Sequence, residues 1–123
     1  MKISEIINSF RYAWSGISFT VKNERNMRIH LCFTVAVIFC SVIFDLTLTH
    51  RAIVIGLCGC VMCAELLNTA VENFVDMMCP TFNMYARRAK DAAAGAVLIM
   101  SIAAAVAGLI IFIPYGLKAL NIM

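Results

Sequence analysis

Charged side chains are scarce in this chain of 123 residues. Only 14% of the residues are Asp, Glu, Lys or Arg, whereas 63% are hydrophobic, and the mean hydropathy is +0.91. A soluble domain of this length cannot bury so much apolar surface, but lipid accepts it directly. The composition therefore predicts an integral membrane protein. The length leaves no room for a separate soluble nucleotide-binding domain, so we expect a single domain, residues 1–123.

Three familiar sequence signals are also missing. Neither of the glycine-rich patterns GxxxxGK[ST] and GxGxxG occurs, so any nucleotide must be held by other means. Residues 1–28 contain no apolar segment with a small-residue cleavage site, so we expect no removable signal peptide. Cys58, Cys60 and Cys63 imitate a ligand cluster, but a helix spreads them around its circumference, and no histidine pair accompanies them. We therefore expect the six cysteines to act as small apolar side chains.

Long apolar stretches predict three membrane-spanning helices, at about residues 29–48, 52–78 and 92–117. A span needs about 20 apolar residues, so the first and third qualify outright, and the second qualifies only if its acidic residues are tolerated. Residues 3–22 carry apolar side chains at helical spacing, and Tyr12 and Trp14 suit the lipid headgroup region. The predicted fold is an all-α membrane protein with three transmembrane helices preceded by an N-terminal amphipathic surface helix.

The distribution of lysine and arginine predicts the orientation of these helices. Five basic residues precede the first span, and three lie between the second and third, at Arg87, Arg88 and Lys90. The positive-inside rule then places the N-terminus and residues 78–90 in the cytoplasm, and the turn at residues 49–51 on the other side. We expect Pro80 to end the second helix and Asp91 to stand at the start of the third, near the positive end of its dipole.

The second span carries a line of polar residues, here called the polar stripe: Glu65, Asn68, Glu72 and Asp76. Their spacing of three and four residues places them on one face of a helix. An acid at the centre of a transmembrane helix costs about 3 kcal/mol, so several on one face need cations or a metal to compensate them. By the predicted topology, Glu72 and Asp76 lie near the cytoplasm, and Glu65 lies two to three turns deeper.

This gradient of depth suits phosphoryl transfer. Shallow acids can hold Mg²⁺, which binds jointly to one or two carboxylates and to substrate phosphates, and Glu24 offers a further ligand. The deeper Glu65, partly removed from water, suits a general base for a lipid hydroxyl. Arg28 and the basic cluster around Lys90 can neutralise phosphate charge. The alternative is that the acids pair with Arg28 or the basic cluster purely for assembly.

Three blocks of the sequence closely resemble the prokaryotic diacylglycerol kinase family, which includes the undecaprenol kinases. The family motif Glu-x-x-Asn-(Ser/Thr)-Ala-(Ile/Val)-Glu-x-x-Val-Asp matches Glu65, Asn68, Thr69, Ala70, Val71, Glu72 and Asp76. A second block, Ala-Lys-Asp followed by small residues and Ala-Val-Leu, matches residues 89–98, and a third matches Asn23, Glu24 and Arg28. The resemblance extends from Phe10 to beyond Ile110.

This resemblance implies a role for each residue of the blocks. Family members are trimers of three-helix subunits with active sites between subunits, so a homotrimer is expected. The catalytic base corresponds to Glu65, and the Mg²⁺ ligands correspond to Glu24 and Glu72. The implied ATP contacts are Tyr12, Glu24, Glu72, Lys90 and Asp91. The implied supporting residues are Asn68, Asp76 and Arg28.

The implied activity is transfer of the ATP γ-phosphate, with Mg²⁺, to the hydroxyl of a membrane lipid alcohol. Arg28-Ile29-His30 and residues 91–95 look more like the undecaprenol kinase branch, whereas enterobacterial diacylglycerol kinases have Glu at the position of His30. Undecaprenol is therefore the favoured substrate, and the alternative is a diacylglycerol kinase making phosphatidic acid. We expect a multi-pass protein of the bacterial inner membrane, with its N-terminus and active site cytoplasmic and no nucleic-acid partner.

Two hypotheses from other functional classes are compatible with the length. A small multidrug-type transporter predicts four spans and one isolated buried acid, whereas this sequence predicts three spans, a line of acids and a basic cluster. A non-catalytic subunit of a membrane assembly predicts that Glu65→Gln leaves the biological role intact. The kinase hypothesis predicts that the same change mostly lowers turnover.

Overall fold

The computed structural model describes residues 2–122, which form four helices and no strand. The helices are α1 (Ile3–Asn23), α2 (Arg25–Ile43), α3 (Leu48–Met78) and α4 (Met84–Ala119). Within the described residues, α2, α3 and α4 are each long and apolar enough to cross a membrane. The predicted all-α class, with three membrane-spanning helices after an N-terminal helix, is therefore confirmed.

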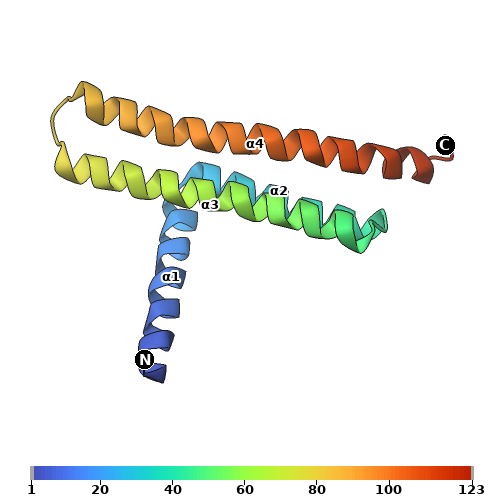
Figure 1. Ribbon diagram of the computed structural model, residues 1–123, viewed down its shortest axis with the longest axis horizontal. Coiled ribbons are helices and arrows are strands. Elements are labelled where there is room, and N and C mark those ends of the chain that lie inside the picture. Colours follow the sequence, from blue (N-terminus) through green and yellow to red (C-terminus); the bar gives the residue numbers. More distant parts are fainter. Residues whose placement is uncertain (1, 123) are drawn as a thin grey trace.

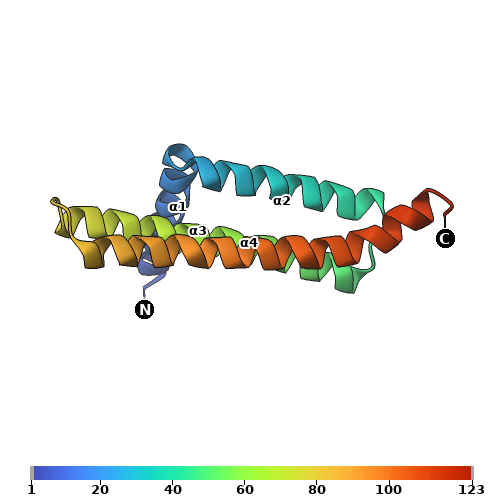
Figure 2. The ribbon, with the colours of Figure 1, turned by 90° about the horizontal axis from the view of Figure 1, so that it is seen from above.

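The longest two helices, α3 and α4, form an antiparallel hairpin, and α2 lies along part of its length (Figures 1 and 2). At about 1.5 Å per residue, α2 is roughly 28 Å long, which matches the apolar thickness of a bilayer of about 30 Å. By the same measure α3 and α4 reach roughly 46 and 54 Å. The closed end of the hairpin therefore extends beyond the corner between α1 and α2 (Figure 1).

The first helix, α1, runs crosswise to the bundle and leaves it at the start of α2 (Figure 1). It contacts α2 and α3 only near this corner, and no contact joins α1 to α4 among the described residues. Its apolar side chains, including Phe10 and Trp14, are exposed. A helix lying across a bundle that spans the membrane runs along the membrane surface, which suits the predicted amphipathic surface helix.

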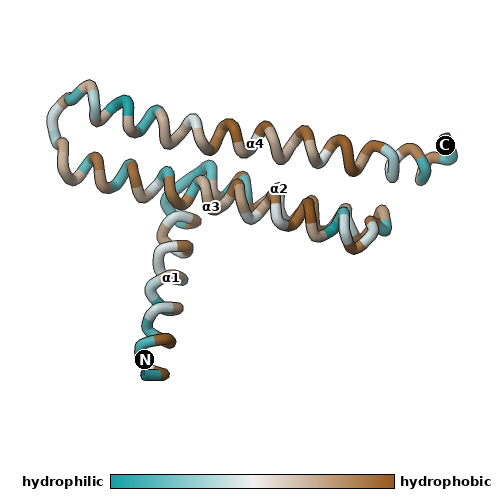
Figure 3. The backbone as a smooth tube through the Cα atoms, viewed as in Figure 1, coloured by the Kyte–Doolittle hydropathy of each residue, from teal (hydrophilic) through white to brown (hydrophobic). Residues whose placement is uncertain are grey.

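The packed face of α3 changes from apolar to polar along its length. Val54 and Val61 are buried, and Glu65 and Asn68 continue the same face one turn after the other. This face packs against α2 on one side and α4 on the other. Figure 3 shows a matching change along α4, which is hydrophilic near its start and strongly hydrophobic farther on. The polar stripe thus lies on the inner face of the bundle.

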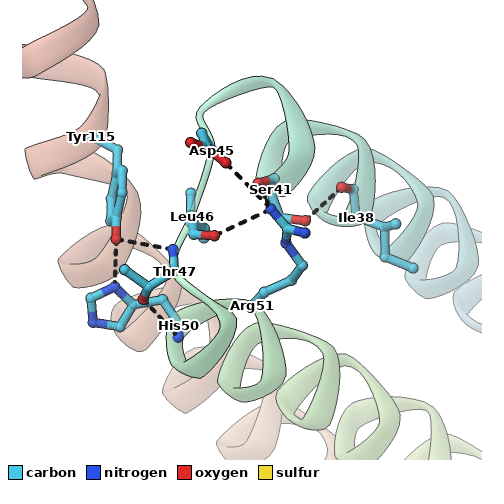
Figure 4. A network of polar contacts seen from close by, with 8 residues as sticks. All are labelled: Ile38, Ser41, Asp45, Leu46, Thr47, His50, Arg51 and Tyr115. Carbon is cyan, nitrogen blue, oxygen red and sulfur yellow. Dashed lines mark hydrogen bonds and ion pairs between the residues drawn. The ribbon is translucent and has the colours of Figure 1, made fainter.

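A polar network closes the end of the bundle opposite the hairpin loop (Figure 4). The side chain of Arg51 donates hydrogen bonds from Nη2 to the carbonyl oxygens of Ser41, at 3.3 Å, and Leu46, at 3.2 Å. The same nitrogen lies 3.9 Å from the carboxylate of Asp45, which is exposed. These contacts hold the end of α2 against the start of α3.

Tyr115 ties α4 to the same end of the bundle (Figure 4). Its hydroxyl oxygen lies 2.9 Å from His50 Nδ1 and accepts a hydrogen bond from the backbone N–H of Thr47 at 3.3 Å. The rings of Tyr115 and His50 meet edge to face. One tyrosine therefore connects the α2–α3 turn, the first turn of α3 and α4.

Two predicted boundaries are wrong. The turn expected at residues 49–51 lies earlier, because Thr47 accepts a hydrogen bond from the N–H of His50 and caps α3, which begins at Leu48. Asp45, just before this turn, adopts a positive φ of 47°. Asp91 is not at the start of α4, because Asn83 caps that helix by accepting hydrogen bonds from the N–H groups of residues 85 and 86. The basic cluster is therefore helical.

Candidate active site

A cavity of about 250 Å³ lies where α2, α3 and α4 meet, and we call it the central cavity. Its lining residues are Asn26, Ile29 and His30 of α2, Glu65 and Asn68 of α3, and Ala94, Val97, Leu98 and Ser101 of α4. Polar and apolar side chains both face the cavity. A space of this kind can receive the polar end of an otherwise apolar molecule.

Glu65 is the most deeply buried acid of the cavity, with 1% of its surface exposed. Its Oε2 atom is buried and has no hydrogen-bond partner within the described residues. No lysine, arginine or histidine forms an ion pair with Glu65 within the described residues. A buried acceptor without a donor is costly, so this oxygen is suited to accept a proton or hydrogen bond from a ligand.

The first turns of α2 set the level of Glu65 in the membrane. Asn26 and His30, which follow closely after the α1–α2 corner, line the same cavity as Glu65. Glu65 therefore lies at the level of the first turns of α2, next to the α1–α2 corner. Glu72 and Asp76 lie farther along α3, toward the hairpin loop. Along α3, Glu65 therefore lies farther from the hairpin loop than Glu72 and Asp76, in the order that the predicted depths require.

Asn68 links the buried and the accessible parts of the polar stripe. Its Nδ2 donates a hydrogen bond to Glu72 Oε1 at 3.2 Å. Its Oδ1 is buried and has no partner within the described residues. The amide is therefore held in one orientation by Glu72, with its oxygen free to accept from a ligand. Glu72 itself is half-buried.

Asp76 and Lys90 form the ion pair that joins α3 to α4 near the hairpin loop. Lys90 Nζ donates to Asp76 Oδ1 at 2.8 Å and Oδ2 at 3.1 Å. One turn away on α4, Arg87 Nε lies 3.8 Å from Asp91 Oδ2, and both side chains are well exposed. These four charges stand at the solvent-accessible end of the site, where phosphate groups can reach them.

Glu24 and Glu72 have the donor chemistry of Mg²⁺ ligands. Both are half-buried carboxylates, and neither forms an ion pair within the described residues. Across those residues no group of three or more His, Cys, Asp and Glu side chains converges on one point. Mg²⁺ commonly binds one or two carboxylates and completes its shell with water and substrate phosphates. A two-carboxylate site of this kind fits the residues present.

Arg28 has a clear structural contact. Its Nη1 donates to the backbone carbonyls of Lys22, at 2.8 Å, and Val21, at 3.4 Å. A cation at the C-terminus of a helix satisfies free carbonyls and complements the helix dipole. Arg28 therefore fixes the α1–α2 corner beside Glu24. Within the described residues Arg28 forms no ion pair with the polar stripe, and its support of the site stays a prediction.

Tyr12 is the predicted site residue that lies apart from the others. It stands in the middle of α1 with 72% of its surface exposed. Lys90 and Asp91 are on α4, which α1 does not contact within the described part of the chain. One chain therefore brings together Glu65, Asn68 and Glu72, and the Asp76–Lys90 pair, without Tyr12.

Sequence reasoning did not single out Ser101 and Asn26, which also line the central cavity. Ser101 is a polar residue inside the longest apolar stretch, but serine is common in apolar helices, so the signal is weak. Asn26 lies in a polar segment where one more amide carries no information. Their common location becomes visible only when three helices are packed together.

A comparison with protein families decides the identity of the fold. Residues 11–112 match the family model of prokaryotic diacylglycerol kinase. The chain belongs to this family. The match covers most of the chain and contains Glu24, the polar stripe, and the adjacent residues Lys90 and Asp91. Membership of this family, with three apolar helices, makes the chain a multi-pass bacterial membrane protein.

Relatives within the family carry two different names. An undecaprenol kinase of Bacillus subtilis is 36% identical over 113 residues, which cover 92% of each chain. A diacylglycerol kinase of Synechocystis is 43% identical over 111 residues, 89% of this chain but 63% of that relative's length. A diacylglycerol kinase of Haemophilus influenzae is 35% identical over 99 residues, covering 79% of this chain and 82% of the relative. All three are named as lipid kinases.

Proposed function

We propose that this protein is a lipid kinase that transfers the γ-phosphate of ATP to the hydroxyl of undecaprenol in the membrane. The family and the relatives' names support a kinase of lipid alcohols. The observation that carries the proposal is Glu65, a buried acid with a free oxygen in the central cavity. We place this cavity just inside the apolar layer of the membrane. A base in that place can meet a hydroxyl that no soluble enzyme reaches without extracting the lipid.

The two substrates approach the site from different solvents. The lipid alcohol enters from the bilayer, where Ile29, Val97 and Leu98 give the central cavity apolar walls. ATP arrives from the cytoplasm at the end marked by the Asp76–Lys90 pair. Lys90 and Arg87 neutralise phosphate charge there, and Tyr12 of a neighbouring subunit completes the nucleotide contacts. This orientation places the N-terminus and the hairpin loop in the cytoplasm.

The reaction needs one proton transfer and one displacement. The proton of the lipid hydroxyl passes to Glu65 Oε2, and the alcohol oxygen forms a bond to the γ-phosphorus. The bond between that phosphorus and the bridging β-phosphate oxygen breaks, and ADP leaves. Asn68 holds the polar stripe in one arrangement through its hydrogen bond to Glu72. General-base help of this type contributes about 10²- to 10⁴-fold in rate.

The metal belongs to the nucleotide end of the site. The family points to a divalent cation, and we propose Mg²⁺ because the available donors are hard carboxylate oxygens. Glu24 and Glu72 are the residues that hold it. When bound, it supplies neutralisation of the phosphate charge. The separation of Glu72 from Glu65 by two helical turns keeps the metal end and the base end of the stripe distinct.

Diacylglycerol is the second candidate substrate. The Synechocystis relative that carries this name has the higher identity, 43%. The Bacillus subtilis undecaprenol kinase, in contrast, matches nearly the whole length of both chains. The mainly apolar lining of the central cavity suits an alcohol whose neighbouring atoms are hydrocarbon, as in a polyprenol. Diacylglycerol places ester groups beside its hydroxyl, and these need further polar partners.

The proposal is tested by purifying the protein in detergent or lipid and supplying [γ-³²P]ATP with Mg²⁺. Undecaprenol and diacylglycerol are offered separately, and a polyprene hydrocarbon without a hydroxyl serves as the blank. We expect label in undecaprenyl phosphate, with a kcat/KM for undecaprenol higher than for diacylglycerol. Stronger labelling of diacylglycerol would make phosphatidic acid the product. Absence of label in both lipids would contradict the lipid-kinase proposal.

A further inference from the structure

Ser101 of α4 faces the central cavity with a hydroxyl that the protein leaves unused. Its Oγ atom is buried and has no hydrogen-bond partner within the described residues. Serine and threonine inside helices usually donate to a carbonyl of the preceding turn. Thr34, Ser41 and Thr69 do so here, at 2.8, 2.7 and 3.0 Å. Ser101 departs from this habit at a position where a cavity ligand can use its hydroxyl.

The hairpin places Ser101 at the same depth as Glu65. The Asp76–Lys90 pair, at 2.8 Å, fixes which residues of α3 and α4 stand opposite each other. Glu65 lies eleven residues before Asp76, and Ser101 lies eleven residues after Lys90 on the antiparallel partner. Both are therefore about 16 Å from the ion pair along their helices. The cavity that they line together confirms that they face the same space.

Glu65 and Ser101 each place an unpartnered polar atom at one level of the central cavity, and together they define a small polar site. Glu65 Oε2 can accept a hydrogen bond, and Ser101 Oγ can donate one. An alcohol has one O–H donor and two lone pairs on the same atom, so a single hydroxyl can satisfy both groups. Ile29, Val97 and Leu98 then surround the hydrocarbon next to that hydroxyl.

We propose that Ser101 binds the substrate hydroxyl and holds its oxygen for attack. Ser101 Oγ–H donates to the alcohol oxygen, while the alcohol O–H donates to Glu65 Oε2. As Glu65 takes the proton and the oxygen bonds to the γ-phosphorus, the bond from Ser101 keeps that oxygen in place. The inference rests on the proposed lipid-kinase function and adds a residue of α4 that recognises the alcohol group.

The test removes the hydroxyl from the protein and from the ligand in turn. Ser101→Ala should raise the KM for undecaprenol about tenfold, the usual effect of losing one hydrogen bond to a ligand. The KM for ATP should stay within about twofold, because the nucleotide end of the site is roughly 16 Å away. Inhibition by the matching polyprene hydrocarbon, which has no hydroxyl, should not change. Ser101→Cys, with a weaker S–H donor, should show a smaller rise in lipid KM.

Ser41→Ala is the matched control, because Ser41 is a buried serine at the opposite end of the bundle, where its hydroxyl donates to the carbonyl of Ile38. It should leave the lipid KM unchanged. An unchanged lipid KM in Ser101→Ala would overturn the inference while leaving the kinase proposal intact. An equal rise in the KM values for lipid and ATP, or loss of hydrocarbon inhibition, would indicate a general disturbance and would also overturn it. Failure of the wild-type protein to phosphorylate any lipid alcohol would reject the kinase proposal and this inference together.

Discussion

In the proposed reaction, acids two turns apart on α3 have different tasks. Glu65 is buried without a donor, whereas Glu72 is half-buried and accepts a hydrogen bond from Asn68. An acid that lacks a cation inside an apolar bundle has no stabilising role to explain it, because burial alone disfavours its charge. Its presence is therefore best explained by chemistry. Glu72 and Glu24, closer to water, suit a metal and its phosphates.

Glu72→Gln tests this division. Gln keeps the size of the side chain and its oxygen for the bond from Asn68, but removes the charge that attracts a divalent metal. We expect the Mg²⁺ concentration needed for half-maximal rate to rise at least about tenfold, as for loss of one ligand-supporting interaction. The measurement is a Mg²⁺ titration of lipid phosphorylation at saturating lipid. Glu5→Gln, on exposed α1, is the control. An unchanged Mg²⁺ dependence would remove Glu72 from the metal site.

Lys90→Ala separates a binding role from a stabilising one. In the Asp76–Lys90 pair, 66% of the Asp76 side chain and 34% of the Lys90 side chain are exposed, and ion pairs open to solvent contribute about 0.2–1 kcal/mol to stability. Thermal unfolding should therefore change little, whereas the KM for ATP should rise several-fold because a phosphate-facing cation is lost. Lys118→Ala, at the far end of the same helix, controls for loss of a positive charge. A large fall in stability with an unchanged ATP KM would show that Lys90 serves the fold alone.

Whole elements explain how the site is placed. The α3–α4 hairpin extends past the α1–α2 corner (Figure 1), and the Asp76 end of the polar stripe lies toward the hairpin loop. The opposite end is closed by Arg51 and by Tyr115, which contacts His50 and Thr47 (Figure 4). The Asp76–Lys90 pair joins α3 to α4 near the hairpin loop, and the Tyr115–His50 contact joins them at the opposite end. The helices cannot slide along each other without breaking these polar contacts. The register that brings Glu65 opposite Ser101 therefore depends on both contacts.

Tyr115→Phe should weaken the closed end. The change removes only the hydroxyl, which contacts His50 Nδ1 at 2.9 Å and the Thr47 N–H at 3.3 Å. We expect a loss of about 1 kcal/mol in unfolding free energy, typical of a hydrogen-bonded group, seen as a lower melting temperature in detergent. Tyr85→Phe, at a tyrosine that is 78% exposed, should have no effect. Equal melting temperatures for the two variants would show that the Tyr115 contacts add nothing to stability.

The helices were predictable from the sequence, but two boundaries and two cavity residues, Asn26 and Ser101, were not. Apolar stretches long enough to cross the apolar layer of a bilayer predict α2, α3 and α4 without any information on tertiary contacts. The start of α4 was misplaced because a basic cluster resembles a loop, whereas the decisive signal is a single cap, Asn83. The polar stripe was visible because Glu65, Asn68, Glu72 and Asp76 share one helix face. The sequence did not predict that Ser101 lines the cavity, because its location opposite Glu65 depends on the register between α3 and α4.

A single chain does not bring all the predicted site residues together. Much apolar surface of α1 is exposed, and Tyr12 stands apart from the nucleotide end on α4. We propose that neighbouring copies supply what one chain lacks, in the homotrimer that the family resemblance implies. The arrangement predicts that Tyr12 of one subunit serves a site whose Glu65 belongs to another.

Mixing two inactive variants tests this assembly. Tyr12→Ala and Glu65→Gln, each expected to lower activity, are unfolded, mixed and refolded together into lipid. If Tyr12 and Glu65 of one site come from different subunits, some mixed trimers contain a site with both wild-type residues, and activity exceeds that of either variant alone. If both come from the same chain, every site carries a defect, and mixing restores nothing. Cross-linking of the mixed sample reports the number of subunits.

The role of Glu65 is the centre of the account, and its replacement by Gln is the most direct test. Wild-type protein and Glu65→Gln are compared in the same bilayer for the rate of ³²P transfer from ATP to undecaprenol, with the KM for ATP measured alongside. Loss of a general base predicts a fall in kcat of at least about 100-fold with the KM for ATP nearly unchanged. A Glu65→Gln protein that labels undecaprenol at the wild-type rate would contradict the account.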